Sequence, residues 1–176
     1  MSRMLVHYNA DMDDDTTDRQ LSGWGQARPD LEVGALQVTA RLSRIGAHLA
    51  RRQEAVFGRF GLGRGEAGML GALRTSGAPY QLSPTKLAKG LMLSSAGATS
   101  RIDRLEGRGY VRRLPDPNDR RGVLIELTDE GLKVIDLAVA ALAVNDRQLL
   151  ERLSPTEIER LEVLLRKLLG GLELPE

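Results

Sequence analysis

Five arginines in the middle of the chain offer the clearest chemistry in the sequence. Arg101, Arg104 and Arg108 are spaced by three and four residues, so they share one face if the segment is helical. Arg120 and Arg121 are adjacent in a polar segment between two apolar runs. A guanidinium group binds phosphate through a fork of donors, and it suits a narrow, electronegative minor groove better than an ammonium group does. These residues predict a surface for double-stranded DNA.

The charge distribution supports that prediction, although the formal net charge is only +1. Residues 84–122 contain nine basic and four acidic side chains, whereas residues 1–32 contain seven acidic and three basic ones. For a polyanionic partner, a local patch matters more than the total charge. The middle of the chain is therefore expected to be cationic, and residues 1–28 are expected to form an acidic extension. The lone Trp24 in this extension suggests that it folds back as a short helix around residues 16–26.

Other kinds of chemistry find little support. The chain has no cysteine, which excludes disulfides, thiolate metal sites and thiol-based redox sensing. Its two histidines, His7 and His48, are too far apart to form a metal motif. The glycines of residues 61–68 lack the preceding strand and the pattern of a phosphate-binding loop. We expect neither an enzyme nor a cofactor or metal.

The same sequence indicates where the protein works. No apolar run approaches the ~20 residues that a membrane span needs, and the N-terminus lacks the layout of a signal peptide. We therefore expect a cytoplasmic protein without a membrane partner. Aromatic residues make up 3% of the chain, which favours aliphatic helix packing.

The arginines must be positioned by the elements around them. Ser83 followed by Pro84 predicts a helix start, because serine caps helices and proline is favoured at the first helical position. This helix is expected to run to about Leu91. Ser94 or Ser95 can cap the next helix, which Gly109 ends and whose inner face carries an alanine, an isoleucine and a leucine, at 98, 102 and 105.

Two short β-type runs follow, at residues 110–114 and 122–127, and a polar link at residues 115–121 joins them into a hairpin with a basic tip. Helix, turn, helix and hairpin is the order of a winged helix-turn-helix unit. The second helix begins with small or hydroxylated residues, which can approach bases and phosphates closely. The residues expected to contact DNA are Pro84, Thr85, Ser95, Ala96, Gly97, Thr99, Ser100, Arg101, Arg104, Asp119, Arg120 and Arg121.

The remaining helices carry long apolar stripes. One follows Pro29, one is capped by Thr128, and one starts at a capping box, Ser154 to Glu157, and ends near Gly170 and Gly171. A single compact winged helix cannot cover these stripes, so they predict a homodimer; packing of the three helices within one chain is the alternative. We expect a mainly α fold with a small β-hairpin wing, in which residues 29–60 and 128–170 form a helical dimerisation region and residues 61–127 the DNA-binding domain.

Several of these segments resemble the MarR family. The similar segments include 82–88, 94–106, 109–111, the wing motif 116–121 (Asp-Pro-Asn-Asp-Arg-Arg) and 127–131. The resemblance covers roughly residues 31–170 and implies a two-fold dimer of interlocked terminal helices that binds a near-palindromic operator. It also implies a salt-bridged pair, Asp119 and Arg121, with Arg120 on the DNA, although the two arginine roles could be exchanged. Half-sites would lie about one helical turn, ~34 Å, apart.

Many members of the family bind a small aromatic or carboxylated molecule between the dimer helices and the DNA-binding lobe. The chain also resembles a urate-responsive branch, in which Trp24, Arg101 and Arg113 match positions of the ligand site. The branch has an aspartate where this sequence has Gly68, which counts against a urate-like ligand. The resemblance implies that a small, anionic aromatic effector releases the protein from DNA, and because a bound protein would block a promoter we expect a repressor. On this hypothesis Trp24 stacks on the ligand and Arg113 pairs with its negative charge. Alternatively, Trp24 only anchors the N-terminal helix.

A second function remains open from the sequence, because some winged helices bind another protein. Salt distinguishes the two partners: DNA binding should weaken steeply with ionic strength, whereas a largely apolar protein interface should hardly respond.

Overall fold

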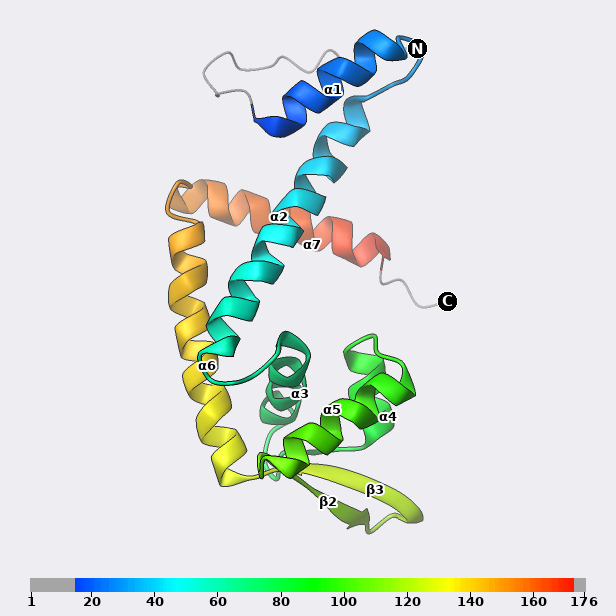
Figure 1. Ribbon diagram of the computed structural model, residues 1–176, viewed down its shortest axis with the longest axis vertical. Coiled ribbons are helices and arrows are strands. Elements are labelled where there is room, and N and C mark those ends of the chain that lie inside the picture. The colour runs from blue at the N-terminus through cyan, green and yellow to red at the C-terminus, as the bar shows by residue number, and fades with distance from the viewer. Residues whose placement is uncertain (1–14, 173–176) are drawn as a thin grey trace. The chain divides into compact units, whose positions relative to one another are not determined.

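The computed structural model describes residues 15–172, and within it the chain divides between Arg51 and Arg52 into two compact units. The first unit holds α1 (Thr16–Ala27) and most of α2 (Gly34–Gly58). The second holds the end of α2 and every later element (Figure 1). His7 and the first half of the acidic extension lie outside the described residues.

The N-terminal extension contains the helix expected from the sequence. The Asp15 side chain caps α1 by accepting from the backbone amides of Thr17, at 2.6 Å, and Asp18, at 3.0 Å. Arg41 of α2 pairs with Asp15 and Asp18, at 3.0 and 2.6 Å, so the two helices of this unit are joined by charge. Leu21 is buried, whereas Trp24 on the same helix is exposed.

In the second unit, three helices and a small sheet form the predicted winged helix-turn-helix. These helices are α3 (Arg64–Thr75), α4 (Pro84–Gly90) and α5 (Ser95–Gly107). The Ser83 hydroxyl caps α4 and the Ser94 hydroxyl caps α5, each by accepting from the backbone amide of the third residue of its helix, at 3.3 and 3.1 Å. Gly109, with a φ of 73°, stops the chain from continuing as a helix.

The sheet differs from the expected two-stranded hairpin. A third strand, β1 (Gln81–Leu82), pairs with β3 (Asp119–Leu127), so the order is β1-β3-β2. The predicted link 115–121 was too long: β2 (Val111–Asp116) and β3 remain paired until Asp116 faces Asp119, which leaves two residues in the turn. Pro115 is tolerated because β2 is an edge strand.

Two long helices complete the chain. Thr128 caps α6 (Asp129–Leu149), and the predicted capping box starts α7 (Pro155–Leu172), where the Ser154 amide donates to Glu157 at 2.8 Å. α7 passes through both glycines that were expected to end it, since glycine lowers helix propensity without ending a helix. Helix α2 begins at Gly34, five residues after the Pro29 that was expected to precede it.

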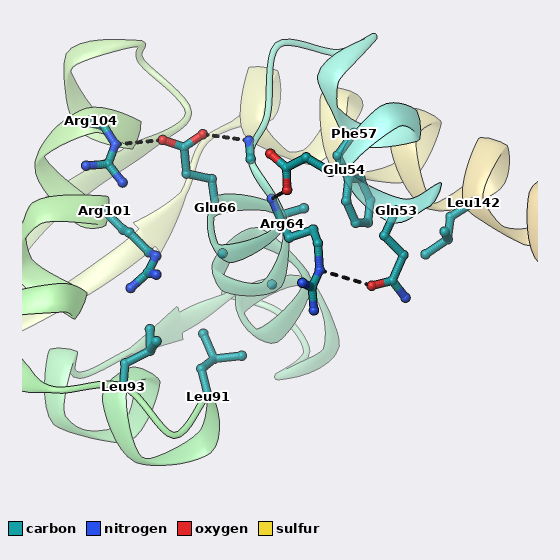
Figure 2. A pocket seen from close by; sticks show the side chains of 14 residues that line it. Gln53, Glu54, Phe57, Arg64, Glu66, Leu91, Leu93, Arg101, Arg104 and Leu142 are labelled. Atoms are coloured by element: carbon teal, nitrogen blue, oxygen red, sulfur yellow. Dashed lines mark hydrogen bonds and ion pairs between the residues drawn. The ribbon is translucent and has the colours of Figure 1, made fainter. Parts of the chain in front are cut away.

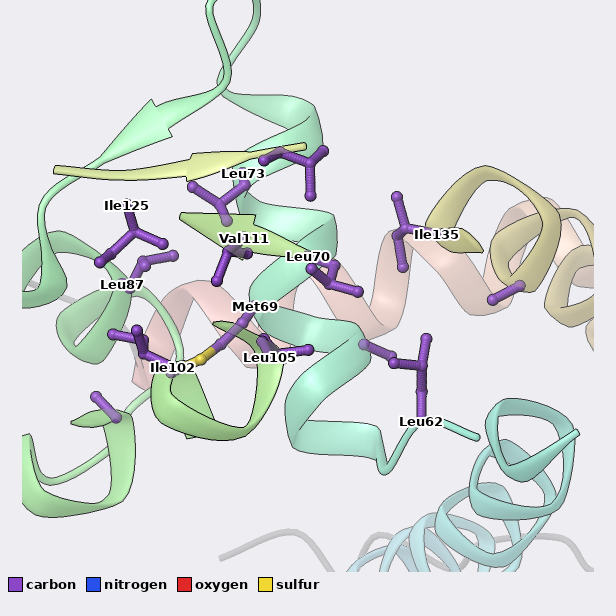
Figure 3. Close-up of a cluster of buried hydrophobic side chains, with 14 of the residues drawn as sticks. Leu62, Met69, Leu70, Leu73, Leu87, Ile102, Leu105, Val111, Ile125 and Ile135 are labelled. Atoms are coloured by element: carbon purple, nitrogen blue, oxygen red, sulfur yellow. The ribbon is translucent and has the colours of Figure 1, made fainter. Parts of the chain in front are cut away.

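The core of the second unit is aliphatic and centres on α3. Met69 and Leu70 of α3 are completely buried, and Ile102 and Leu105 of α5 pack on the same cluster (Figure 3). Ile135 of α6 closes it from another side, with further residues from α4 and the sheet. This packing holds α5 by its predicted inner face and leaves its other side exposed.

Candidate nucleic-acid interface

The exposed part of α5 begins with small side chains. Ser95, Ala96, Thr99 and Ser100 are exposed, as the prediction for a DNA-contacting helix requires. Most of the hydroxyl groups here already have partners on the helix itself: Thr99 Oγ1 donates to the Ser95 carbonyl at 3.0 Å, and Ser100 Oγ accepts from Arg104 at 2.8 Å. The surface therefore offers methyl groups and the free side of each hydroxyl to a partner.

Gly97 lies on a different side of α5. An added Cβ there would come within 3.2 Å of Arg101 Nη1 and 3.1 Å of Ser94 Oγ. Gly97 thus faces the arginine row of α5 rather than the exposed first-turn residues.

The arginine row of α5 is less free than the sequence suggested. Arg104 Nε donates to Glu66 Oε1 of α3 at 2.9 Å, and Arg108 Nη1 lies 3.6 Å from Glu66 Oε2 and donates to the Gly61 carbonyl at 2.6 Å. Arg101 Nη1 donates to the Gly97 carbonyl at 3.1 Å. The row therefore ties α5 to the start of α3, although Arg104 keeps half of its side chain exposed.

Glu66 is the residue that sequence analysis missed. Its side chain is 11% exposed, and its Oε2 also accepts from the Gly63 amide at 3.0 Å. Burial alone would raise the pKa of Glu66, but the hydrogen bonds from Arg104 and Gly63 and the charges of Arg104 and Arg108 lower it overall. Its position three residues after Gly63, as in a capping box, was the signal available in the sequence.

The wing carries the freest guanidinium groups. Arg120 and Arg121 are exposed on β3 and, within residues 15–172, neither forms an ion pair. The expected side-chain pair between Asp119 and Arg121 is absent from these described residues: Asp119 Oδ1 accepts from the backbone amide of Arg121 instead, at 2.9 Å. The guanidinium groups of Arg120 and Arg121 are thus both available to bind phosphate.

The wing also meets the start of α4. A hollow of about 500 Å³ lies between them, and its lining includes Pro84, Thr85, Asp119 and Arg121. Lys86 and Lys89 are exposed on α4. The structure thus brings the predicted residues of α4 and the wing together on one side of the lobe.

A larger cavity, of about 710 Å³, lies beside α5, next to the start of α3 and the end of α2 (Figure 2). Its charged lining consists of three arginines, Arg64, Arg101 and Arg104, and two carboxylates, Glu54 and Glu66. Apolar side chains come from the end of α2, from the turn between α4 and α5, and from α6: Phe57, Leu91, Leu93 and Leu142. Gly68 lines this cavity as well, so the position where the urate-responsive branch has an aspartate contributes no carboxylate here.

The predicted ligand residues are not brought together around this cavity. Arg101 lines it, whereas Arg113 does not. The guanidinium of Arg113 is held by Asp103 at 2.6 Å and by Glu106, and these two carboxylates raise the pKa of Arg113. Trp24 belongs to the other unit.

Two other kinds of feature are absent from residues 15–172. No helix there is long and apolar enough to cross a membrane. No group of three or more acidic residues and histidines there has the arrangement to hold a metal ion.

The fold and the exposed cationic hairpin define a winged helix-turn-helix protein, and comparison with known proteins specifies it further. The model of the MarR family matches residues 72–123. The chain is 40% identical to the HTH-type transcriptional regulator PecS of Dickeya dadantii, over 85% of this chain and 88% of that one. It is 36% identical to the multiple antibiotic resistance protein MarR of Escherichia coli, over 50% of this chain and 62% of that one.

Solved structures agree. A MarR family transcriptional regulator from Streptomyces coelicolor, in complex with DNA, superposes with a TM-score of 0.72 at 27% identity, covering 81% of this chain and 94% of that one. A mutant MarR from E. coli complexed with operator DNA gives 0.66 at 25% identity, over 86% and 98%. The chain belongs to the MarR family. This membership confirms the prediction of a DNA-binding transcription regulator rather than an enzyme.

Proposed function

We propose that the chain acts in the cytoplasm as a homodimeric repressor that binds a near-palindromic operator and releases it when a small anionic molecule binds. The observation that carries this proposal is the pair of unpaired, exposed arginines on the wing, beside the exposed start of α5. Repression follows from the simplest mechanism, in which a bound dimer blocks the promoter.

The test is a mobility-shift assay on the DNA upstream of the chain's own gene. Replacing Arg120 and Arg121 by alanine should abolish the shift, because the wing loses two cations that can neutralise phosphates. The matched control replaces Arg147 and Arg152, which are exposed at the end of α6 that lies away from the wing (Figure 1). Both variants lose two positive charges, so unchanged binding of the wing variant would remove the wing from the mechanism.

The homodimer is proposed from the exposure of the last helix. None of the residues of α7 is buried in the single chain, and its large apolar side chains recur at helical spacing. They are Leu161, Val163, Leu164, Leu165, Leu168, Leu169 and Leu172. α2 and α6 expose apolar residues too, including Val38, Ile45 and Leu137. A second copy of the chain would cover such faces on both partners at once.

Sedimentation or light scattering tests this part of the proposal. The parent should have twice the 19.3 kDa mass of one chain. Replacing Leu164 and Leu168 by glutamate should give a monomer, because burial of two unpaired carboxylates is strongly unfavourable. A parent that is monomeric at micromolar concentration would exclude the dimer.

The effector is proposed to bind in the 710 Å³ cavity beside α5. Its lining combines four large apolar side chains with three arginines and two glutamates. Arg104 pairs with Glu66, whereas Arg101 hydrogen-bonds only to a backbone carbonyl among the described residues. That combination suits an aromatic ring with a negative group. A panel of aromatic acids and purines, added to the mobility-shift assay, should release the DNA with at least one member.

Trp24 reports on the N-terminal helix during the same titration, because it is the only tryptophan. Its fluorescence should respond if Trp24 stacks on the ligand. A ligand that releases DNA without changing this fluorescence would leave Trp24 as an anchor of α1.

A further inference from the structure

Arg113 on β2 of the wing is held by two carboxylates of α5, the helix expected to contact DNA. Its Nη2 lies 2.6 Å from Asp103 Oδ1, and its Nη1 pairs with Glu106 Oε2. The backbone amide of Arg113 also donates to Glu106 Oε1, at 3.1 Å. These three contacts join β2 to one flank of α5.

The position of Asp103 makes this contact relevant to DNA. Asp103 is exposed and follows Ala96 and Thr99 at spacings of seven and four residues, so it shares their side of α5, away from the buried Ile102. A carboxylate on that side faces the same partner as the first turn of the helix. Without a nearby cation, Asp103 and Glu106 would repel the phosphates of a bound duplex.

We propose that Arg113 is a positioning residue for DNA binding, which neutralises Asp103 and Glu106 and holds them off the phosphate backbone. The inference rests on the proposed binding of operator DNA, and it gives Arg113 a role apart from the effector. Arg113 is well suited to it, since a planar guanidinium can serve two carboxylates at once, whereas an ammonium group acts as a point charge.

The chain offers a matched control one residue away. Arg112 is also exposed on β2, but it pairs with Glu126 on the neighbouring strand, and Glu126 additionally accepts from Gln81. The hydrogen bond from Gln81 has the largest effect on the pKa of Glu126 and lowers it. Burial raises this pKa, but the hydrogen bond from Arg112 lowers it as well, so the overall shift is downward. Loss of Arg112 therefore changes the net charge as loss of Arg113 does, without freeing a carboxylate on α5.

The experiment measures affinity for one 30-base-pair duplex, selected by the parent protein from a randomised library, at several salt concentrations. Arg113→Ala should weaken binding about tenfold or more at low salt, whereas Arg112→Ala should have a much smaller effect. The loss should shrink as the salt concentration rises, because salt screens the repulsion between the freed carboxylates and the phosphates. Adding Asp103→Asn and Glu106→Gln to Arg113→Ala should restore most of the affinity, because the carboxylates that repel the DNA are then gone.

The outcomes are distinct. Restored binding in the triple variant supports the proposal, as does a partial loss with Arg113→Lys, which keeps the charge but not the fork. If Arg113→Ala binds like the parent, or if the triple variant stays as weak as Arg113→Ala while circular dichroism shows it folded, the proposal is overturned. If the parent selects no duplex at all, the proposed function fails instead.

Discussion

Replacement of Glu66 by glutamine tests how α5 is fixed to α3. Glutamine keeps the size of the side chain and an oxygen that can accept from the Gly63 amide, at 3.0 Å in the parent. The variant loses the charge that attracts Arg104 at 2.9 Å and Arg108 at 3.6 Å. The substitution therefore removes the electrostatic part of the contact and leaves most of the packing in place.

The expected cost follows from this geometry. Glutamine still accepts a hydrogen bond from the charged guanidinium of Arg104, so the substitution removes the attraction between the two charges and not the hydrogen bond itself. Loss of that attraction costs about 1 kcal/mol. Because the Arg104 side chain is more than half exposed, solvent screening lowers the energy of its ion pair with Glu66. The carboxylate of Glu66 is largely buried, and a buried charge without a partner would be unfavourable in the parent protein. We expect Glu66→Gln to lower the free energy of unfolding by about 1 kcal/mol at pH 7.

The pH dependence makes the test sharper. The pKa of Glu66 is lowered in the folded chain, so its contribution is complete above the ordinary value of about 4.3 and is lost as the pH falls through the lowered pKa. Urea unfolding followed by circular dichroism should show a difference between parent and variant at pH 7 that closes in acid. A variant as stable as the parent, or a difference that does not change with pH, would refute the reasoning.

Glu157→Gln is the control for this comparison. Glu157 also occupies the capping-box position of a helix. Hydrogen bonds from Ser154 and, to a smaller extent, the charge of Arg160 lower its pKa, but in the described chain no arginine forms an ion pair or a hydrogen bond with it. Its replacement should destabilise the chain less than that of Glu66. An equal effect of the two substitutions would show that capping, and not the arginines, gives Glu66 its importance.

Two further predictions concern glycines. Gly131→Ala should prevent folding, because a Cβ there would lie 2.1 Å from the backbone carbonyl of Tyr110. Gly71→Ala, with nothing within 4 Å of the added Cβ, should be neutral or slightly stabilising. Thermal melts compare the two variants, and a stable Gly131→Ala would contradict the close approach of α6 to the backbone just before β2. Gly68→Asp should fit, since its Cβ would meet Leu91 at 3.5 Å, and should weaken release by an anionic effector about tenfold or more through repulsion, with DNA affinity unchanged. Unaltered release in the mobility-shift assay would place the effector elsewhere.

The local elements could be predicted from the sequence because their signals are local. Ser83 and Thr128 cap the helices that they were expected to cap, Ser94 is the cap of the two candidates Ser94 and Ser95, and Gly109 ends α5. These predictions depend on hydrogen bonds within a few residues of each other, which a sequence displays directly. The strand β1 was missed because two residues show no periodicity, and only their pairing with β3 makes them a strand.

The partners of the arginines could not be predicted in the same way. Arg104 and Glu66 are 38 residues apart, and Arg112 meets Glu126 only through the register of β2 and β3. Helical spacing places Arg101, Arg104 and Arg108 on one face but does not say which element covers it. The expectation of a freely exposed basic face on α5 therefore differs from the structure.

These contacts change how the positive charge of the lobe should be used. Nine basic residues lie between positions 84 and 122. Four of them form ion pairs with carboxylates: Arg104 and Arg108 with Glu66 of α3, Arg112 with Glu126 of β3, and Arg113 with Asp103 of α5. The side chains without such a partner in the described chain include Lys86 and Lys89 on α4 and the two wing arginines. Phosphate attraction should therefore come mainly from the elements flanking α5, while α5 itself, held by paired charges, presents short neutral side chains to the bases. On that division of roles, exchanging wing arginines alters affinity for every sequence alike, whereas exchanging Ala96 or Thr99 alters which sequence is preferred.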